Sequence, residues 1–199
     1  DIMLGTQMVA KGLDFPGVRL VGVVDADAAL WLPDLRAGER AFQLLMQVVG
    51  RAGRKEGESL AIVQAGDVEA PAIREALRMD YERFAELELA GRRRLFYPPF
   101  SRLVRLVLAD SRPGRARDAA EELAAALRKT AATVHPHLRV DEAEPCVMPR
   151  LREMLRYEII IRGPRDGTVQ RLLRAAESEK ALRPRVQRFT VDVDAVDLL

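Results

Sequence analysis

The sequence has 199 residues, of which 48% are hydrophobic and 31% charged, and its formal net charge is +2. These values exclude a disordered or collagen-like chain and leave enough residues for one or two domains with a sizeable core. No apolar run approaches the roughly 18 residues of a membrane span, and no signal peptide is visible, so we expect a cytoplasmic protein. The single cysteine, Cys146, excludes an internal disulfide. With His135 and His137 it also falls short of a closed zinc site, so no metal is expected in this chain.

The charge is divided unevenly along the chain. Residues 1–91 carry a net charge of −5, whereas residues 92–199 carry +7. This asymmetry predicts two domains with different partners, the second of them binding a polyanion such as nucleic acid. The alternative is a solvated arginine-rich surface without a ligand.

The first half has the pattern of an α/β domain. Short apolar runs at Ile2–Gly5, Val18–Val24 and Leu60–Gln64 predict strands buried on both faces of a parallel sheet. Between them, apolar residues at helical spacing predict a helix over Glu39–Val49, with Gly50 as its end.

A longer helix is predicted from Ala70 to about Arg94, because apolar residues recur there at spacings of three and four. The segment Tyr97–Phe100 contains two adjacent prolines, which remove two backbone donors and force extended backbone. We therefore predict a domain boundary here, between residues 1–96 and 97–199.

The second half predicts the order βαββαβ. This order is typical of the split βαβ motif, an antiparallel sheet with two helices on one face. The predicted elements are strand Leu103–Leu108, helix Arg115–Ala132, strand Leu138–Glu142, strand Tyr157–Arg162, helix Thr168–Glu177 and strand Val186–Val193.

One segment near the end of the first predicted helix has the pattern Q-x-x-G-R-x-G-R, from Gln47 to Arg54. Arginine carries a planar, permanently charged fork that matches phosphate oxygens, and Arg51 and Arg54 could converge on one phosphate group. Such arginines accelerate phosphoryl transfer by orders of magnitude. The alternative is that the two glycines merely cap the helix and the arginines are solvated.

A second segment, Gly5–Pro16, follows a predicted strand and reads G-T-Q-M-V-A-K-G-L-D-F-P. Loops at the carboxyl ends of parallel strands are where α/β folds bind ligands. By itself this loop could also be a set of turns.

Together, in this order, the two segments resemble motifs V and VI of superfamily 2 helicases. With V-D-A-D at Val24–Asp27, Y-P-P-F at Tyr97–Phe100 and V-D-V-D at Val191–Asp194, the whole chain resembles the bacterial primosomal replication-restart helicase family. The resemblance covers the second half of a RecA-like helicase lobe 2 and the C-terminal domain.

The resemblance implies roles for the motif residues. Arg51 and Arg54 would be catalytic arginine fingers that reach the ATP phosphates, and Gln47 would line the same cleft. The residues facing the nucleotide would include Gly12 and Asp14. Gly5, Thr6 and Gln7 would contact the nucleic-acid backbone.

The phosphate loop and the Mg²⁺-binding carboxylates of such a motor do not occur in this sequence. We interpret the chain, which begins at Asp1, as a fragment that is inactive alone, with ATP and Mg²⁺ bound by the intact parent. The family's zinc-binding cysteines would also lie upstream. The alternative is a parent without ATPase activity that recognises forks and recruits partners.

In this family the C-terminal domain resembles the fold of ribosomal protein S10. The resemblance implies that the parent binds forked and single-stranded DNA, single-strand-binding protein, other primosome proteins and the replicative helicase, at the nucleoid. As DNA contacts we single out Arg92, Arg93, Arg94 and Arg156, and as contacts for single-strand-binding protein Arg165, Gln170 and Arg171.

Overall fold

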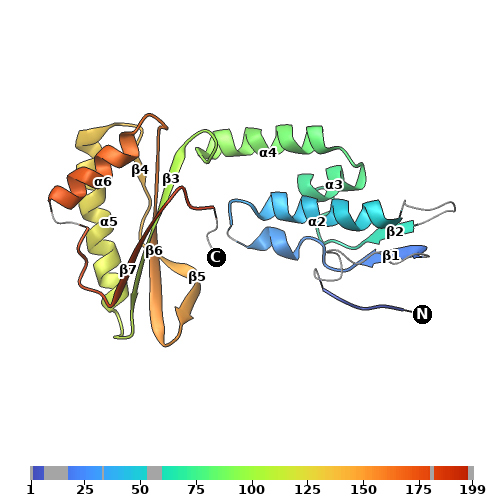
Figure 1. Cartoon of the computed structure of the whole chain (residues 1–199), viewed down its shortest axis with the longest axis horizontal. Helices are drawn as coiled ribbons and strands as arrows, with labels where there is room; N and C mark the ends of the chain where they lie inside the picture. The colour runs from blue at the N-terminus through green and yellow to red at the C-terminus, as the bar shows by residue number, and fades with distance from the viewer. Residues whose placement is uncertain (1, 7–17, 33, 53–59, 180–181, 197–199) are drawn as a thin grey trace. The chain divides into compact units, whose positions relative to one another are not determined.

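The computed structural model describes residues 2–6, 18–32, 34–52, 60–179 and 182–196, and for Arg51 and Ala52 only the helical backbone. Contacts divide the chain into a first unit, Asp1–Ala90, and a second unit, Gly91–Leu199. The first contains a two-stranded parallel sheet and the second an antiparallel sheet (Figure 1). The predicted mixed α/β class is therefore confirmed, and the division between the units lies upstream of the Tyr97–Phe100 segment.

The parallel sheet of the first unit pairs β1 (Leu20–Val23) with β2 (Leu60–Val63), in register from Leu20 opposite Leu60. Helix α2 (Ala37–Ala52) packs on one face of this sheet. The other face, with Leu20, Leu60 and Ile62, is more than half exposed. The expectation that these strands are buried on both faces is wrong for the described chain, because α2 covers only one face.

The predicted strand at Ile2–Gly5 is also wrong. Residues 2–6 have no regular structure, and Ile2 and Leu4 are exposed. A strand needs a neighbour to accept its backbone hydrogen bonds, and no described strand pairs with this segment.

The core of the first unit joins α2 to the two helices that follow β2. Phe42 stacks on Phe84, with ring centroids 4.2 Å apart and an interplanar angle of 6°. Leu45 and Ile73 are fully buried beside them. A short 3-10 helix, η1 (Ala28–Trp31), connects β1 to this layer.

The single long helix predicted from Ala70 is two helices, α3 (Pro71–Leu77) and α4 (Tyr81–Leu95). Met79 adopts a left-handed conformation with φ of 54°, and the backbone N–H of Asp80 donates to the carbonyl of Glu75. Asp80 Oδ1 then accepts from the Arg83 N–H at 2.8 Å, which caps the start of α4. Periodicity alone missed this break because the apolar spacing continues across it.

The second unit has the element order β3, α5, β4, β5, β6, α6, β7. Its sheet has the order β4-β6-β3-β7, with β5 also paired to β6, and all pairs are antiparallel. The strands are β3 (Arg102–Asp110), β4 (Arg139–Val140), β5 (Glu144–Leu151), β6 (Met154–Gly163) and β7 (Arg188–Val193).

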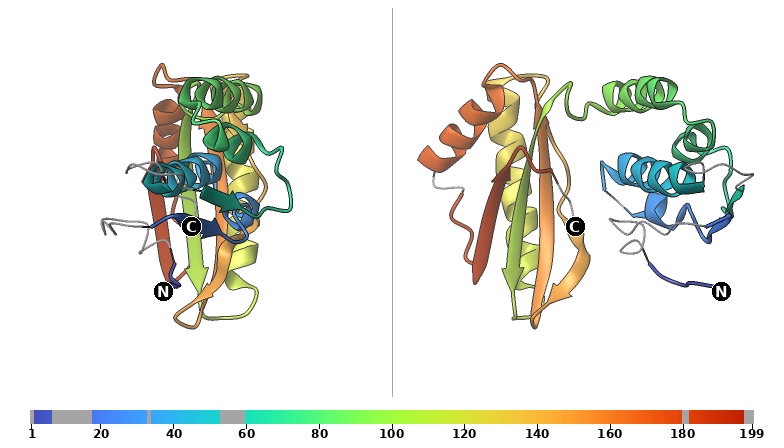
Figure 2. Two further views of the ribbon diagram at one scale, coloured as in Figure 1. Left: turned by 90° about the vertical axis from the view of Figure 1, so that its right-hand side faces the viewer. Right: turned by 45° about the vertical axis from the view of Figure 1, so that its right-hand side comes forward.

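Helices α5 (Arg115–Val134) and α6 (Thr168–Ser178) cover one face of the antiparallel sheet (Figures 1 and 2). Because β6 lies between β3 and β4, and β3 lies between β6 and β7, the chain forms two split βαβ units as the sequence predicts. Leu106, Leu127 and Ile159 form the centre of the core between sheet and helices. Both Tyr157 and Phe189 pack against this core.

The sequence did not predict β5. It contains Pro145 and Pro149, which cannot donate to a ladder and are tolerated on edge strands and at irregularities. The pairing of β5 with β6 shifts register between Pro145 and Arg150, which accommodates both prolines.

A buried carboxylate ties the end of β3 to the segment that leads into β7. Asp110 has no exposed surface, and its oxygens accept from the Arg112 side chain at 2.7 and 2.9 Å and from the Gln187 N–H at 3.2 Å. The Arg112 guanidinium holds the pKa of Asp110 well below its usual range. A pKa lowered by folding stabilises the fold above the ordinary pKa of aspartate, and this contribution is lost as the pH falls below about 5.

We therefore expect Asp110→Asn to lower the Tm by a few degrees at pH 7, because Arg112 loses its charged partner. The difference from the unchanged protein should narrow steadily between about pH 5 and pH 2, because Asp110 becomes protonated in the unfolded chain over this range while it stays ionised in the folded protein. Thermal unfolding followed by circular dichroism at several pH values measures this, with a substitution of the exposed Asp192, Asp192→Asn, as the control. A Tm difference that is constant over this range would contradict the assigned role.

Candidate nucleic-acid and partner interfaces

The glutamine and the first arginine of the Q-x-x-G-R-x-G-R pattern lie on α2. Gln47 is exposed, and Arg51 follows one turn later on the helical backbone, which places the two positions on one side of the helix. Gly50 does not end the helix as predicted, because α2 continues to Ala52. Arg54 lies outside the described residues, and so does the side chain of Arg51.

Of the residues singled out in the Gly5–Pro16 segment, the structure describes Gly5 and Thr6. Both are exposed and lie outside helices and strands. Gln7, Gly12 and Asp14 lie outside the described residues. The predicted nucleotide-facing and nucleic-acid-facing roles of this segment therefore stay predictions.

At the carboxyl ends of β1 and β2 the structure places a buried carboxylate, Asp27. Its Oδ2 accepts from the N–H groups of Gly66 and Asp67, both at 3.0 Å. These two backbone bonds lower the pKa of Asp27. The second aspartate of the V-D-A-D segment thus joins the two loops that follow the parallel strands, a role that the sequence pattern alone did not indicate.

The arginines predicted to contact DNA at the end of α4 differ in their partners. Arg92 Nη1 donates to the carbonyl of Pro98 at 3.4 Å, and the Arg93 guanidinium lies 4.6 Å from the ring centroid of Phe100. Arg94 is exposed, and no contact of its guanidinium with a described residue is seen. Two of the three therefore hold the Tyr97–Phe100 segment, and Arg94 faces solvent.

Two further arginines reach residues 95–97, at the start of this connection, from the sheet. Arg162 on β6 lies over the ring of Tyr97 and donates to the carbonyl of Leu95 at 3.1 Å. Arg139 on β4 lies 5.2 Å from the ring centroid of Phe96. These cation–π contacts fix the connection to the sheet, and the sequence reasoning missed them because nothing in the pattern pairs residues so far apart.

The residues predicted to bind a partner lie at the beginning of α6. Arg165 Nη1 donates to the carbonyl of Pro99 at 3.1 Å, and Arg171 Nη2 donates to Thr168 Oγ1 at 2.7 Å. The side chain of Gln170 lies against the guanidinium of Arg102. All three side chains therefore lie near the N-terminal end of α6, although each contacts a different neighbour.

Arg102 connects this helix end to the end of β7. Its Nε and Nη2 bind the two carboxylate oxygens of Asp194 at 2.8 and 2.6 Å. The bond from Arg102 holds the pKa of Asp194 below its usual value. Asp194 is the last residue of the V-D-V-D segment, which is one of the motifs shared with the replication-restart helicases. Its ion pair with Arg102 could not be predicted from the sequence.

The sheet face opposite the helices contains a buried ion pair. Arg105 Nε binds Glu158 Oε2 at 2.6 Å, and both side chains are largely buried. Cys146 on β5 lies near this pair, and burial raises the pKa of its thiol. This cluster has the character of a structural element rather than of a reactive site.

Arg156, the remaining predicted DNA contact, lies on β6 in the β5–β6 hairpin. Its Nη1 approaches the carbonyl of Met148 at 3.5 Å, which is the limit of a hydrogen bond. On the same hairpin Arg150 forms an ion pair with Glu153. The hairpin therefore presents several arginines that the sequence analysis did not recognise as a group.

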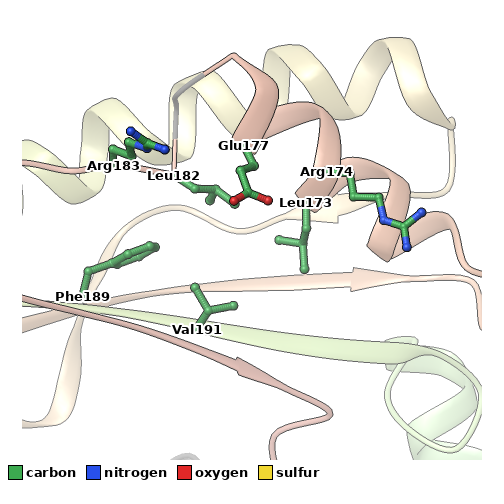
Figure 3. A pocket seen from close by; sticks show the side chains of 7 residues that line it. All are labelled: Leu173, Arg174, Glu177, Leu182, Arg183, Phe189 and Val191. Carbon is green, nitrogen blue, oxygen red and sulfur yellow. The ribbon is translucent and has the colours of Figure 1, made fainter.

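A groove of about 350 Å³ lies between α6 and β7 (Figure 3). Apolar side chains form its walls, and Arg174, Glu177 and Arg183 form its charged rim. The apolar residues are Leu173, Leu182, Phe189 and Val191. The three residues predicted to bind a partner do not line this groove.

Two features are absent from the part of the chain that the structure describes. No described helix is long and apolar enough to cross a membrane. No group of three or more histidine, cysteine, aspartate or glutamate side chains in the described ranges is arranged to hold a metal ion.

Comparisons with known proteins place the chain in a family. Residues 93–196 match the family described as the primosomal protein N C-terminal domain. The chain is 40% identical to the replication restart protein PriA of Treponema pallidum, over 100% of this chain and 30% of that protein. It is 38% identical to PriA of Bacillus subtilis, over 87% of this chain and 21% of that protein, and 34% identical to PriA of Chlamydia pneumoniae, over 98% and 25%.

The chain thus spans between a fifth and a third of the length of these relatives. The match covers more than half of the chain and most of the second unit, from the end of α4 to the residues that follow β7. The chain therefore belongs to the PriA family of replication restart proteins.

Proposed function

We propose that the longer protein containing this chain is an ATP-dependent 3′–5′ DNA helicase of replication restart. It binds forked DNA, directs primosome assembly and reloads the replicative helicase. The observation that carries the proposal is the occurrence, in one chain, of the two helicase-like motifs and the C-terminal domain match over residues 93–196. In this proposal the first unit is part of a RecA-like lobe 2 and the second an S10-like domain.

The motor role rests on the α2 motif and the Gly5–Pro16 segment. Arg51 and Arg54 act as arginine fingers on the ATP phosphates, with Gln47 beside them, and Gly12 and Asp14 face the nucleotide. The exposure of Gln47, one helical turn from Arg51, supports this arrangement. The chain has no phosphate loop and no Mg²⁺-binding carboxylate motif, so other parts of the longer protein would hold ATP and Mg²⁺.

The DNA-binding role rests on the positive second half. Arg94 and Arg156 would contact phosphates, while Arg92 and Arg93 would act partly by holding the Tyr97–Phe100 segment. Gly5, Thr6 and Gln7 would contact the nucleic-acid backbone from the first unit. Phosphate contacts of this kind give affinity without sequence preference.

Protein partners would meet the beginning of α6. Arg165, Gln170 and Arg171 offer two guanidinium groups and an amide at one helix end, which suits the acidic tail of a single-strand-binding protein. The Arg102–Asp194 ion pair braces this end, so its loss would alter the same surface.

The test is an unwinding assay with the full-length protein on matched forks. One fork carries a 3′ single-stranded tail and the other a 5′ tail, each with a fluorophore and quencher at the duplex end. We expect ATP-dependent strand separation on the 3′-tailed fork only. Tight fork binding without ATP hydrolysis would replace the motor with a platform that recognises forks and recruits partners.

A further inference from the structure

The turn between β5 and β6 combines a tight geometry with residues that are poorly suited to it. Leu151 pairs with Met154, so the connection has two residues, Arg152 and Glu153. Both have positive φ, 48° and 64°. A two-residue hairpin turn with positive φ at both positions strongly favours Asn-Gly, because other side chains are strained there. Strained residues of this kind cluster at functional sites.

The side chains around this turn are apolar and basic. Leu151 is 44% exposed and Met148 is 49% exposed. The guanidinium of Arg150 is exposed although it pairs with Glu153, and Arg152 is exposed. With Arg156 on the following strand, the hairpin carries three arginines; its register places Arg150 on the face of the helices and Leu151 and Arg156 on the opposite face.

The turn lies at one end of the second unit, where the long β6 extends with β5 beyond the pairing with β4 (Figure 2). Strand β6 stays paired with β3 as far as Leu155 opposite Asp110, so the part of the hairpin beyond this pairing is the Leu151–Met154 pair and the two turn residues. A short turn held by the sheet in this way can place the residues at its tip against a groove of duplex DNA.

We propose that the β5–β6 hairpin binds the minor groove of duplex DNA at its junction with single strands. Arg150, Arg152 and Arg156 contact the phosphates and the groove, and Leu151 and Met148 press against the terminal base pair. Proteins that use apolar side chains in this way must unstack bases, which costs a few kcal/mol per step within a duplex. The terminal base pair has already lost one stacking neighbour, so a junction is the least costly place for this contact.

This inference rests on the proposed binding of forked DNA. It adds that the β5–β6 hairpin makes the contact and that the contact is in the minor groove. The deciding variant is Arg152→Asn/Glu153→Gly in the 199-residue chain. It leaves the net charge unchanged and installs the pair that the turn geometry favours. We expect the Tm to stay the same or rise by about 2–4 °C, since turn strain is relieved.

The same variant should bind forked DNA about tenfold more weakly, because it loses the side chains at the tip. Its affinity for a single-stranded oligonucleotide of equal length should change less than about twofold. Fluorescence anisotropy with labelled fork, blunt duplex and single strand measures all three. The matched control is Glu121→Gln/Arg128→Gln, which is also charge-neutral and lies on the exposed side of α5.

A second variant, Leu151→Thr, tests the apolar contact without touching the turn. Leu151→Thr should weaken binding to the fork more than binding to blunt duplex. If the turn variant does not fold, this comparison tests the hairpin proposal in its place. Fork binding by both variants equal to that of the unchanged chain would overturn the hairpin proposal alone. No fork binding by the unchanged chain would overturn the proposed DNA binding itself.

Discussion

Replacement of Arg54 by alanine in the full-length protein is expected to lower fork-stimulated ATP hydrolysis by about three orders of magnitude. The proposed role of Arg54 is to stabilise the charge that develops on the transferred phosphoryl group, which is a transition-state interaction. Fork affinity should therefore stay within about twofold, since the ground-state complex with DNA does not depend on it. Steady-state phosphate release and fork anisotropy on the same preparations measure the two quantities.

Two further variants separate this role from others. Arg54→Lys should recover little activity, because a compact ammonium does not reproduce the planar guanidinium fork. Arg19→Ala removes an exposed arginine just before β1 and should leave hydrolysis unchanged. Parallel loss of fork binding and ATP hydrolysis in Arg54→Ala would instead indicate a role in DNA binding or folding.

Binding of forked DNA by the 199-residue chain is expected to weaken by about 100-fold between 50 and 200 mM salt. Each phosphate neutralised by an arginine contributes a slope of about −0.9 in log affinity against log salt, so about four contacts produce this change. The arginines available for them are exposed ones such as Arg94 and Arg152, because Arg102, Arg105 and Arg162 are engaged in ion pairs within the second unit. Anisotropy titrations at several salt concentrations give the slope.

The matched variants for this experiment are Arg94→Gln and Arg128→Gln. Arg94→Gln should reduce the magnitude of the slope by about one and weaken binding to all sequences alike. Arg128, on the exposed side of α5, lies outside the proposed contacts and should leave the slope unchanged. Salt-independent binding would argue for an apolar interface in place of phosphate contacts.

The candidate site could be predicted from sequence only in part. A helix carrying Gln47 was predicted, but Arg51 was expected after its end at Gly50, whereas α2 continues through both positions. The partners of Arg93, Arg162 and Asp194 were not, because each contact joins segments that only the folded sheet brings together. The turn at Arg152 and Glu153 was also missed, since neither residue is a turn signal and β5 contains two prolines.

The sequence by itself determined most elements of this protein and the topology of its second unit. Hydrophobic periodicity is a local property, and it placed α5, α6, β3 and β6 within a few residues of their observed bounds. Tertiary structure decided the break at Met79, the irregular strand β5 and the exposure of Ile2–Gly5. Each of these depends on which neighbour accepts a backbone hydrogen bond or covers an apolar face, and that neighbour is distant in the chain.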